Sequence, residues 1–264
     1  MVLRRDRAIV LAALLTLTAL AWAYLLLLSA QMAMPTQAME GMAGMAMDGM
    51  VMGATAPASN LLFAFGMWAV MMIGMMTPSV APMILLYAKV GRRARSNSEP
   101  FASAGWFVAG YLVAWIGFAL AASVVQEALK AASILTPALA SASGIFAGVL
   151  MIGAGVYQWS PLKNSCLGQC RAPLLFVQQH GGFRPNPLGA LTLGLKHGAY
   201  CIGCCWALMT LLFIGGVMNL LWVAGLAILV LLEKVVPAGW HLARALGLAL
   251  VVAGSILLVR SAEM

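Results

Sequence analysis

Charged residues are scarce in this chain. They make up 8% of its 264 residues, whereas roughly a quarter of the residues in an ordinary soluble domain are charged. Hydrophobic residues make up 63%, which is more than a soluble core needs. A transmembrane helix requires about 20 mostly apolar residues, and several such runs follow one another with short polar connections between them. The composition therefore excludes an ordinary soluble fold and predicts an all-α, polytopic transmembrane helical bundle.

Several functional signatures are also missing. The sequence contains no nucleotide-binding glycine loop, no serine triad motif and no paired-carboxylate motif. Its 15 Lys and Arg residues give a net charge of +8, but they are not gathered with aromatic residues in one exposed domain, as nucleic-acid binding requires. They stand at the ends of apolar runs, where lipid headgroups attract them. We therefore expect the lipid bilayer as a partner, and no nucleic acid.

The apolar runs predict about seven spans with a cytoplasmic N-terminus. Three arginines precede the first run, and a second basic group at residues 89–95 follows the second run. The positive-inside rule places both groups in the cytoplasm, so the C-terminus lies outside. The alternative for the first run is removal as a signal peptide. The expected spans are residues 8–29, 61–87, 101–125, 138–159, 188–216, 217–232 and 242–259.

Three segments follow from this topology. Residues 1–30 form an N-terminal transmembrane helix, residues 31–60 form a methionine-rich extracytoplasmic loop, and residues 61–264 form a six-span membrane domain. Residues 160–187 are expected as the longest inner loop of that domain. The sixth span is expected to end at Glu233 and Lys234 on the inner side.

The sharpest chemical signature lies in the fifth expected span. His197, Cys201 and Cys205 are four residues apart in turn, and Cys204 follows Cys201 by three. Residues at these spacings share one face of a helix, so an imidazole and three thiols converge. Such soft ligands suit Cu(I) and zinc. The alternative is packing, because cysteine also behaves as a small hydrophobic residue.

Methionines form a second signature. Met71 and Met75, with Met72 and Met76 beside them, follow helical spacing in the second span. A stripe of this kind also serves as packing. The expected outer loop adds eight more methionines, however, and a polar loop gains nothing from thioether packing, whereas thioethers are soft ligands for Cu(I). Secondary candidate ligands are Cys166 and Cys170 of the inner loop and Met39, Met42, Met45, Met47 and Met50 of the outer one.

The segment Met71-Met72-Ile73-Gly74-Met75-Met76-Thr77-Pro78, taken with the run His197 to Trp206, carries a resemblance to a known family. Together they resemble the bacterial family of predicted metal-binding integral membrane proteins, long catalogued as a domain of unknown function. The resemblance covers residues 61–255 and includes the segment from Tyr157 to Lys163. It implies metal binding, copper handling and a place in the bacterial inner (cytoplasmic) membrane, and it implies no particular reaction.

The leading hypothesis is a membrane protein that collects Cu(I) through the outer methionines and holds or passes it at a buried methionine and cysteine site. It would act in copper trafficking, insertion or transport, with a copper protein or membrane complex as its partner. Zinc is the competing metal. Two other readings stay open at this point: a membrane enzyme that uses the thiols or a bound metal for redox chemistry, and a structural subunit of a membrane complex.

Overall fold

The computed structural model describes residues 2–42, 57–98, 100–136, 139, 141, 143–183, 185–236 and 239–263. Within those ranges every extended regular element is a helix, and a single β-bridge joins Leu135 to Ser141. The all-helical fold class is therefore confirmed over the described part of the chain. The helices are α1 (Val2–Met42), α2 (Pro57–Ser96), α3 (Ala104–Ala131), α4 (Gly144–Tyr157), α5 (Pro161–Arg171), α6 (Pro173–Gln179), α7 (Pro187–Thr210), α8 (Leu212–Gly215), α9 (Leu220–Val235) and α10 (Gly239–Ala262).

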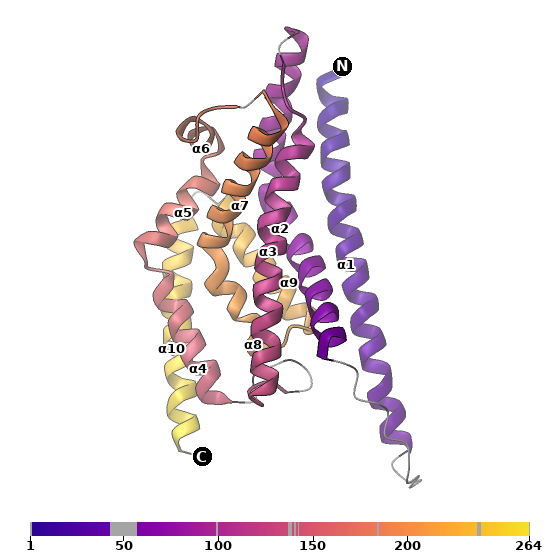
Figure 1. The fold of residues 1–264 in the computed structure, drawn as a ribbon. Helices are drawn as coiled ribbons and strands as arrows, with labels where there is room; N and C mark the ends of the chain where they lie inside the picture. Colours follow the sequence, from indigo (N-terminus) through magenta and orange to yellow (C-terminus); the bar gives the residue numbers. More distant parts are fainter. Residues whose placement is uncertain are drawn as a thin grey trace.

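Five of these helices, α1, α2, α3, α7 and α10, are long and apolar enough to cross a membrane. A sixth crossing is formed if α4 and α5, which meet at a bend of 64°, are taken as one broken span. The expected sixth span corresponds to α9, which has only 16 residues. The described residues thus supply five or six candidate spans by length and composition, and the expected seven are not confirmed. The start of α1 and the end of α10 lie at opposite ends of the bundle (Figure 1).

The first helix is longer than the sequence predicts. It continues past residue 30 to Met42, into the segment expected as a loop. Ala, Met and Gln dominate residues 30–39, and all three are good helix formers. The backbone of Met39 and Met42 therefore belongs to α1, while the side chains of both lie outside the described part. Met45, Met47 and Met50 lie outside the described residues altogether.

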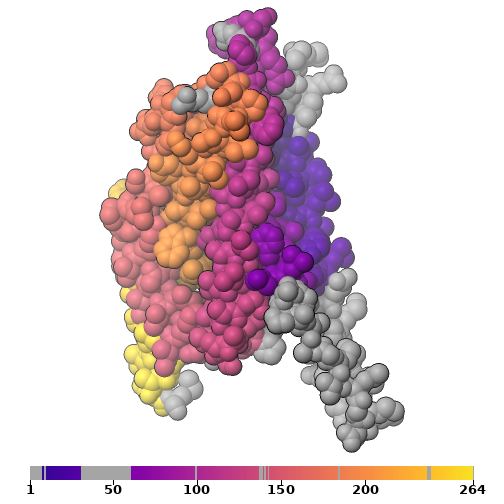
Figure 2. Space-filling view, in the orientation of Figure 1, coloured from indigo at the N-terminus to yellow at the C-terminus, as the bar shows by residue number. Residues whose placement is uncertain are grey.

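The centre of the bundle is organised around α3, which packs against α2 on one side and α7 on the other. The contact with α7 is close because small residues face each other, as is common between membrane helices. A Cβ added to Gly110 would lie 2.0 Å from the Leu191 carbonyl oxygen, and one added to Gly194 would lie 2.0 Å from that of Phe107. Helices α4 and α10 pack together beside this core, and α1 packs along α2. Figure 2 shows α3, α5 and α7 together on one face of the molecule.

The expected inner loop at residues 160–187 is wrong, because most of it is helical. Ser160 caps α5 by accepting a hydrogen bond from the Lys163 amide at 3.1 Å, and Pro161 occupies the first turn, a position that suits proline. The buried residues of α5 include Cys166 and Leu167, and the helix packs against α7. Tertiary contact therefore stabilises a segment whose own composition favours a loop.

Candidate metal site

Helix α7 carries the predicted ligand run in its interior. His197, Cys201, Cys204 and Cys205 are all buried. The thiols of Cys204 and Cys205 both donate to the Cys201 carbonyl oxygen, each at 3.0 Å. This back-bonding to a carbonyl three or four residues earlier is the usual local outlet for a donor in a helix, and it turns both sulfur atoms toward the Cys201 turn. The predicted convergence of the three cysteines on one side of α7 is present.

The Cys201 thiol meets polar groups of α3 and α9, and these are bonded in turn to α2. The ammonium of Lys234, in the last turn of α9, donates to the Cys201 sulfur at 2.9 Å. The hydroxyl of Tyr111 in α3 lies 3.2 Å from the same sulfur and donates to the Met76 carbonyl oxygen at 3.2 Å. Lys234 also donates to the Ser79 hydroxyl of α2 at 3.1 Å. Cys201 is therefore the point at which α2, α3, α7 and α9 are connected.

Helix α5 brings the other two cysteines to the same place. The Cys170 thiol lies close to those of Cys201 and Cys204. Cys166 lies against the backbone of Gly203, where an added Cβ would stand 2.7 Å from its sulfur. All five cysteines are free thiols, and Cys170 is the only one of them that is partly exposed. We call Cys166, Cys170, Cys201, Cys204 and Cys205 the thiol cluster.

A buried ion pair lies beside the thiol cluster. The Lys163 ammonium of α5 binds the Glu233 carboxylate of α9 at 2.7 Å, and it also donates to the Gln158 side chain. All three side chains are about 1% exposed. Among the described residues, the second carboxylate oxygen of Glu233 and the Gln158 amide nitrogen have no hydrogen-bond partner. The pair connects α5 to α9 one residue away from the Lys234 contact with α7.

His197 does not join the thiols by a hydrogen bond. Its ring packs among aromatic side chains, with centroid distances of 4.9 Å to Phe176, 5.8 Å to Phe107 and 6.1 Å to Tyr111. Its Nδ1 atom is buried, with no partner in the described part of the chain. His197 therefore lies one helical turn from Cys201 in an aromatic pocket, and its predicted role as a ligand stays a prediction.

The methionines of α2 are all buried: Met71, Met72, Met75 and Met76 are at most 3% exposed. The Met76 carbonyl is tied to Tyr111, so this turn of α2 lies close to the thiol cluster. Met75 lines a separate cavity of about 320 Å³ with Trp22 of α1, Pro78 of α2 and Ile228 of α9. The α2 methionines thus do not share one environment: Met76 lies beside Tyr111, and Met75 lines a groove among α1, α2 and α9.

No set of three or more His, Cys, Asp or Glu side chains within the described ranges is already arranged to hold a metal ion. The thiols of Cys204 and Cys205 are engaged with a backbone carbonyl, and the Cys201 sulfur is engaged with Lys234 and Tyr111. Binding of a metal by the cluster requires these contacts to be exchanged for bonds to the metal.

The sequence interpretation missed the polar partners of the thiols. The sequence predicts Glu233 and Lys234 at the inner end of a span and Lys163 in a loop. Lys163 lies instead in α5, and all three side chains are buried within the protein. The signal was the length of the apolar run before them. From residue 217 to 232 it covers 16 residues, fewer than the roughly 20 needed to span a bilayer, which argues against a full crossing that ends at these charges.

Comparison with known families supplies the remaining evidence. Residues 65–257 match the family model PpoB2, described as a copper chaperone. No curated protein matches the chain, and no solved structure does. The matched region begins in α2 and ends in α10, so it contains the whole thiol cluster and all of its polar partners. Because the match covers well over half of the chain, the protein belongs to the PpoB2 copper chaperone family.

Proposed function

We propose that this protein is an integral membrane copper chaperone that holds Cu(I) at the thiol cluster and passes it to a copper protein or membrane complex. The observation that carries the proposal is the meeting of all five cysteines with Lys234 in one buried place, in a chain of a copper chaperone family. Five helices of spanning length, and the bilayer expected from composition, support a place in the bacterial inner membrane.

Charge balance favours Cu(I) over zinc. A Cu(I) ion held by two thiolates carries one net negative charge, which the Lys234 ammonium 2.9 Å from Cys201 neutralises. Such neutrality matters in a buried site, because an uncompensated charge there is strongly unfavourable. Zinc reaches the same balance only with three thiolates, and its structural sites take four ligands. No group of three such ligands is arranged among the described residues. A Cu(I) ion held by two sulfur donors therefore fits the cluster better than a zinc ion.

The ligands nearest to this arrangement are Cys201 and the cysteines around it. The Cys170 thiol lies close to the Cys201 sulfur, and the Cys204 thiol donates to the Cys201 carbonyl oxygen. Loss of their protons on metal binding breaks these weak contacts and frees the sulfur lone pairs, because only deprotonated thiols are strong ligands. Cys170 is partly exposed, which makes it the member of the cluster best placed to exchange metal with the outside of the protein.

The methionines supply a route to the thiols in this proposal. The outer segment that contains Met39, Met42, Met45, Met47 and Met50 collects Cu(I), and Met71, Met72, Met75 and Met76 pass it along α2. Thioethers bind Cu(I) as neutral soft ligands, so transfer from them to thiolates is downhill. The tie between Met76 and Tyr111, which also contacts Cys201, supports the last step of this route.

Metal analysis of the purified protein tests the proposal. The wild type, loaded with Cu(I) under reducing conditions, should retain copper, and X-ray absorption at the copper edge should show sulfur neighbours. Cys201→Ser should lose most of the metal. Ala207→Ser is the matched control, because it adds a hydroxyl to a buried position of the same helix without removing a thiol. Full copper retention after Cys201, Cys204 and Cys205 are all replaced by Ser would rule out the site.

A redox enzyme is the second candidate, favoured by the ammonium that stabilises a thiolate at Cys201. Turnover separates the two functions. A chaperone releases one bound ion to an acceptor without consuming an electron donor, whereas an enzyme oxidises the donor in proportion to time. Multiple turnovers with a thiol or quinol donor would favour the enzyme. If the wild type retains no copper after the loading step, the cluster has a purely structural role.

A further inference from the structure

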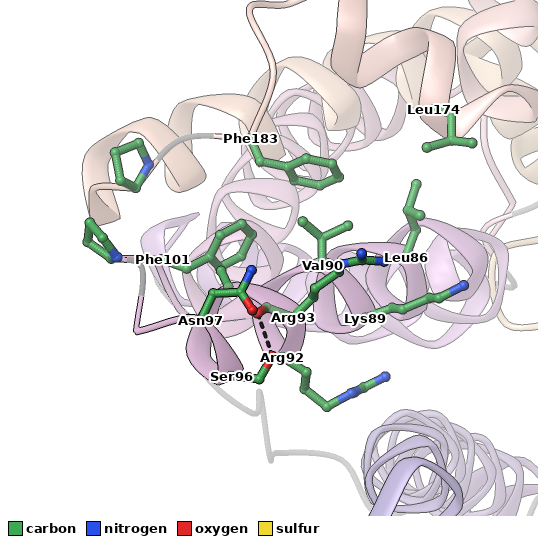
Figure 3. Close-up of a pocket in the computed structure, with 13 residues that line it drawn as sticks. Leu86, Lys89, Val90, Arg92, Arg93, Ser96, Asn97, Phe101, Leu174 and Phe183 are labelled. Atoms are coloured by element: carbon green, nitrogen blue, oxygen red, sulfur yellow. Dashed lines mark hydrogen bonds between the residues drawn. The ribbon is translucent and has the colours of Figure 1, made fainter.

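A large open cavity lies away from the thiol cluster, at the C-terminal end of α2. It has a volume of about 980 Å³ and is bounded by that end of α2, the segment around Phe101, and residues of α6 and the connection that follows it. Figure 3 shows how its lining residues lie. Nothing in the copper site accounts for this cavity, because none of the five cysteines or their polar partners lines it.

The floor of the cavity is apolar. Leu86 and Val90 of α2 face Phe101 and Phe183 across it. The two phenylalanine rings pack on each other, with centroids 5.9 Å apart, and both pack on the buried Tyr87 ring, at 5.1 and 5.4 Å. Leu174 of α6 lies at the edge and is 58% exposed. A surface of this kind favours a hydrocarbon ligand over water.

The rim of the cavity is basic. Lys89 and Arg93 line it from α2, one turn apart, and neither side chain forms an ion pair or hydrogen bond with the described residues. In Figure 3 the Arg93 side chain extends along the cavity toward Leu86, while Arg92 points away from Phe183. Among the lining residues that the structure describes there is no carboxylate. The cavity therefore joins two unpaired cations to an apolar floor.

Depth along α2 places this rim near a membrane surface. Lys89 follows Leu61, the start of the apolar span, by 28 residues, or about 42 Å at the rise of an α-helix. The hydrocarbon core is only about 30 Å thick, and the headgroup layers bring the bilayer to about 40–45 Å. With Leu61 at one edge of the core, the Lys89 backbone stands about 12 Å beyond the opposite edge, just outside the headgroup layer, and the Arg93 side chain extends back toward Leu86 and that layer.

We propose that this cavity binds an anionic phospholipid, whose phosphate contacts Lys89 and Arg93 and whose acyl chain lies on the floor formed by Leu86, Val90, Phe101 and Phe183. Inorganic phosphate would use the rim but would leave the apolar floor exposed. A zwitterionic lipid would use the floor but would not neutralise the two cations. The proposal rests on the membrane placement in the proposed function and is independent of copper binding.

Lipid retention tests the proposal. The full chain, delipidated in detergent and then placed in bilayer discs of phosphatidylcholine with phosphatidylglycerol, is extracted, and its bound lipids are counted by native mass spectrometry. The wild type should retain phosphatidylglycerol. The double variant Lys89→Gln with Arg93→Gln should bind it about thirtyfold more weakly, the loss expected for two basic residues at a headgroup. Val90→Trp, which fills the floor and keeps both charges, should also reduce retention.

The controls separate this pocket from general charge effects. Arg95→Gln with Arg260→Gln removes the same charge outside the cavity and should leave retention unchanged. An equal loss in this control pair, equal retention of phosphatidylcholine by the wild type, or full displacement of the lipid by inorganic phosphate would each overturn the proposal. Copper content is measured on the same samples. Wild-type protein that binds copper but no phosphatidylglycerol contradicts the lipid proposal alone, and wild-type protein that binds the lipid but no copper contradicts the proposed function alone.

Discussion

Glu233 and Lys234 are neighbours in α9 but bind different helices. The carboxylate of Glu233 pairs with Lys163 of α5, and the ammonium of Lys234 contacts the Cys201 sulfur of α7. Because α5 carries Cys166 and Cys170 while α7 carries the other three cysteines, one dipeptide connects both halves of the thiol cluster. Changes at these two positions should therefore alter the cluster in different ways.

Replacing Lys234 by Met should weaken Cu(I) binding by about 10–100-fold, the usual effect of removing a group that contacts a metal ligand. The physical reason is loss of the positive charge that balances a copper dithiolate. Competition with a chromophoric Cu(I) chelator measures the affinity. Lys234→Arg should recover part of it, and Lys196→Met, an exposed lysine on α7, should have no effect. Unchanged affinity in Lys234→Met would remove Lys234 from the proposed site.

Breaking the Lys163 and Glu233 pair on one side should destabilise the protein. Glu233→Leu leaves the Lys163 ammonium buried without a carboxylate, at a cost of about 3–5 kcal/mol. The double variant Lys163→Met with Glu233→Leu removes both charges and should be more stable than the single variant. Thermal unfolding in detergent gives the comparison. A double variant less stable than Glu233→Leu would show that Lys163 stabilises the fold even without Glu233, through its hydrogen bond to Gln158.

Gly203→Ala should disturb the thiol cluster with little effect on the fold. The new methyl group would stand 2.7 Å from the Cys166 sulfur, so that thiol must rotate away from α7. We expect a lower Cu(I) affinity and an almost unchanged melting temperature. Gly225→Ala is the matched control, because nothing lies within 4 Å of its added Cβ. Equal behaviour of the two variants would mean that Cys166 takes no part in metal binding.

Met75→Leu should slow copper loading while leaving the final copper content near normal. Met75 lines a groove among α1, α2 and α9, so a thioether there serves transfer, and the thiols determine retention. Stopped-flow loading from a Cu(I) chelate measures the rate. Met83→Leu, another buried methionine of α2, controls for packing. A loss of copper content equal to that of Cys201→Ser would make Met75 a ligand of the main site.

The local part of the site could be predicted from the sequence, and the long-range part could not. Helical spacing alone brings Cys201, Cys204 and Cys205 together, because i and i+4 positions share a face whatever the helix packs against. The position of Cys166 and Cys170 beside the cysteines of α7 depends on how α5 packs against α7. The periodicity of the sequence does not predict that contact. Tyr111 was missed for the same reason, since one tyrosine in an apolar span carries no pattern.

The fold shows a similar division. Long apolar runs identify helices of spanning length directly, and residues 61, 104 and 187 each begin a candidate span within a few residues of the expected position. Segments whose structure depends on neighbours were less predictable. Residues 161–171 have weak apolar character and several polar side chains, so only their burial against α7, unknown beforehand, makes them a stable helix.

The length of α9 determines where the charged side chains in its last turn lie. Its 16 residues extend about 24 Å, less than the thickness of a hydrocarbon core of about 30 Å. The lysine in its last turn does not extend along the outer surface, because its ammonium is held by Cys201 and Ser79. Its rotation about the helix axis is fixed by the residues before it. One residue inserted after Asn219 would turn Glu233 and Lys234 by about 100°. Both contacts would then be lost at once, so the number of residues in α9 is as much a determinant of the thiol environment as the identity of the lysine.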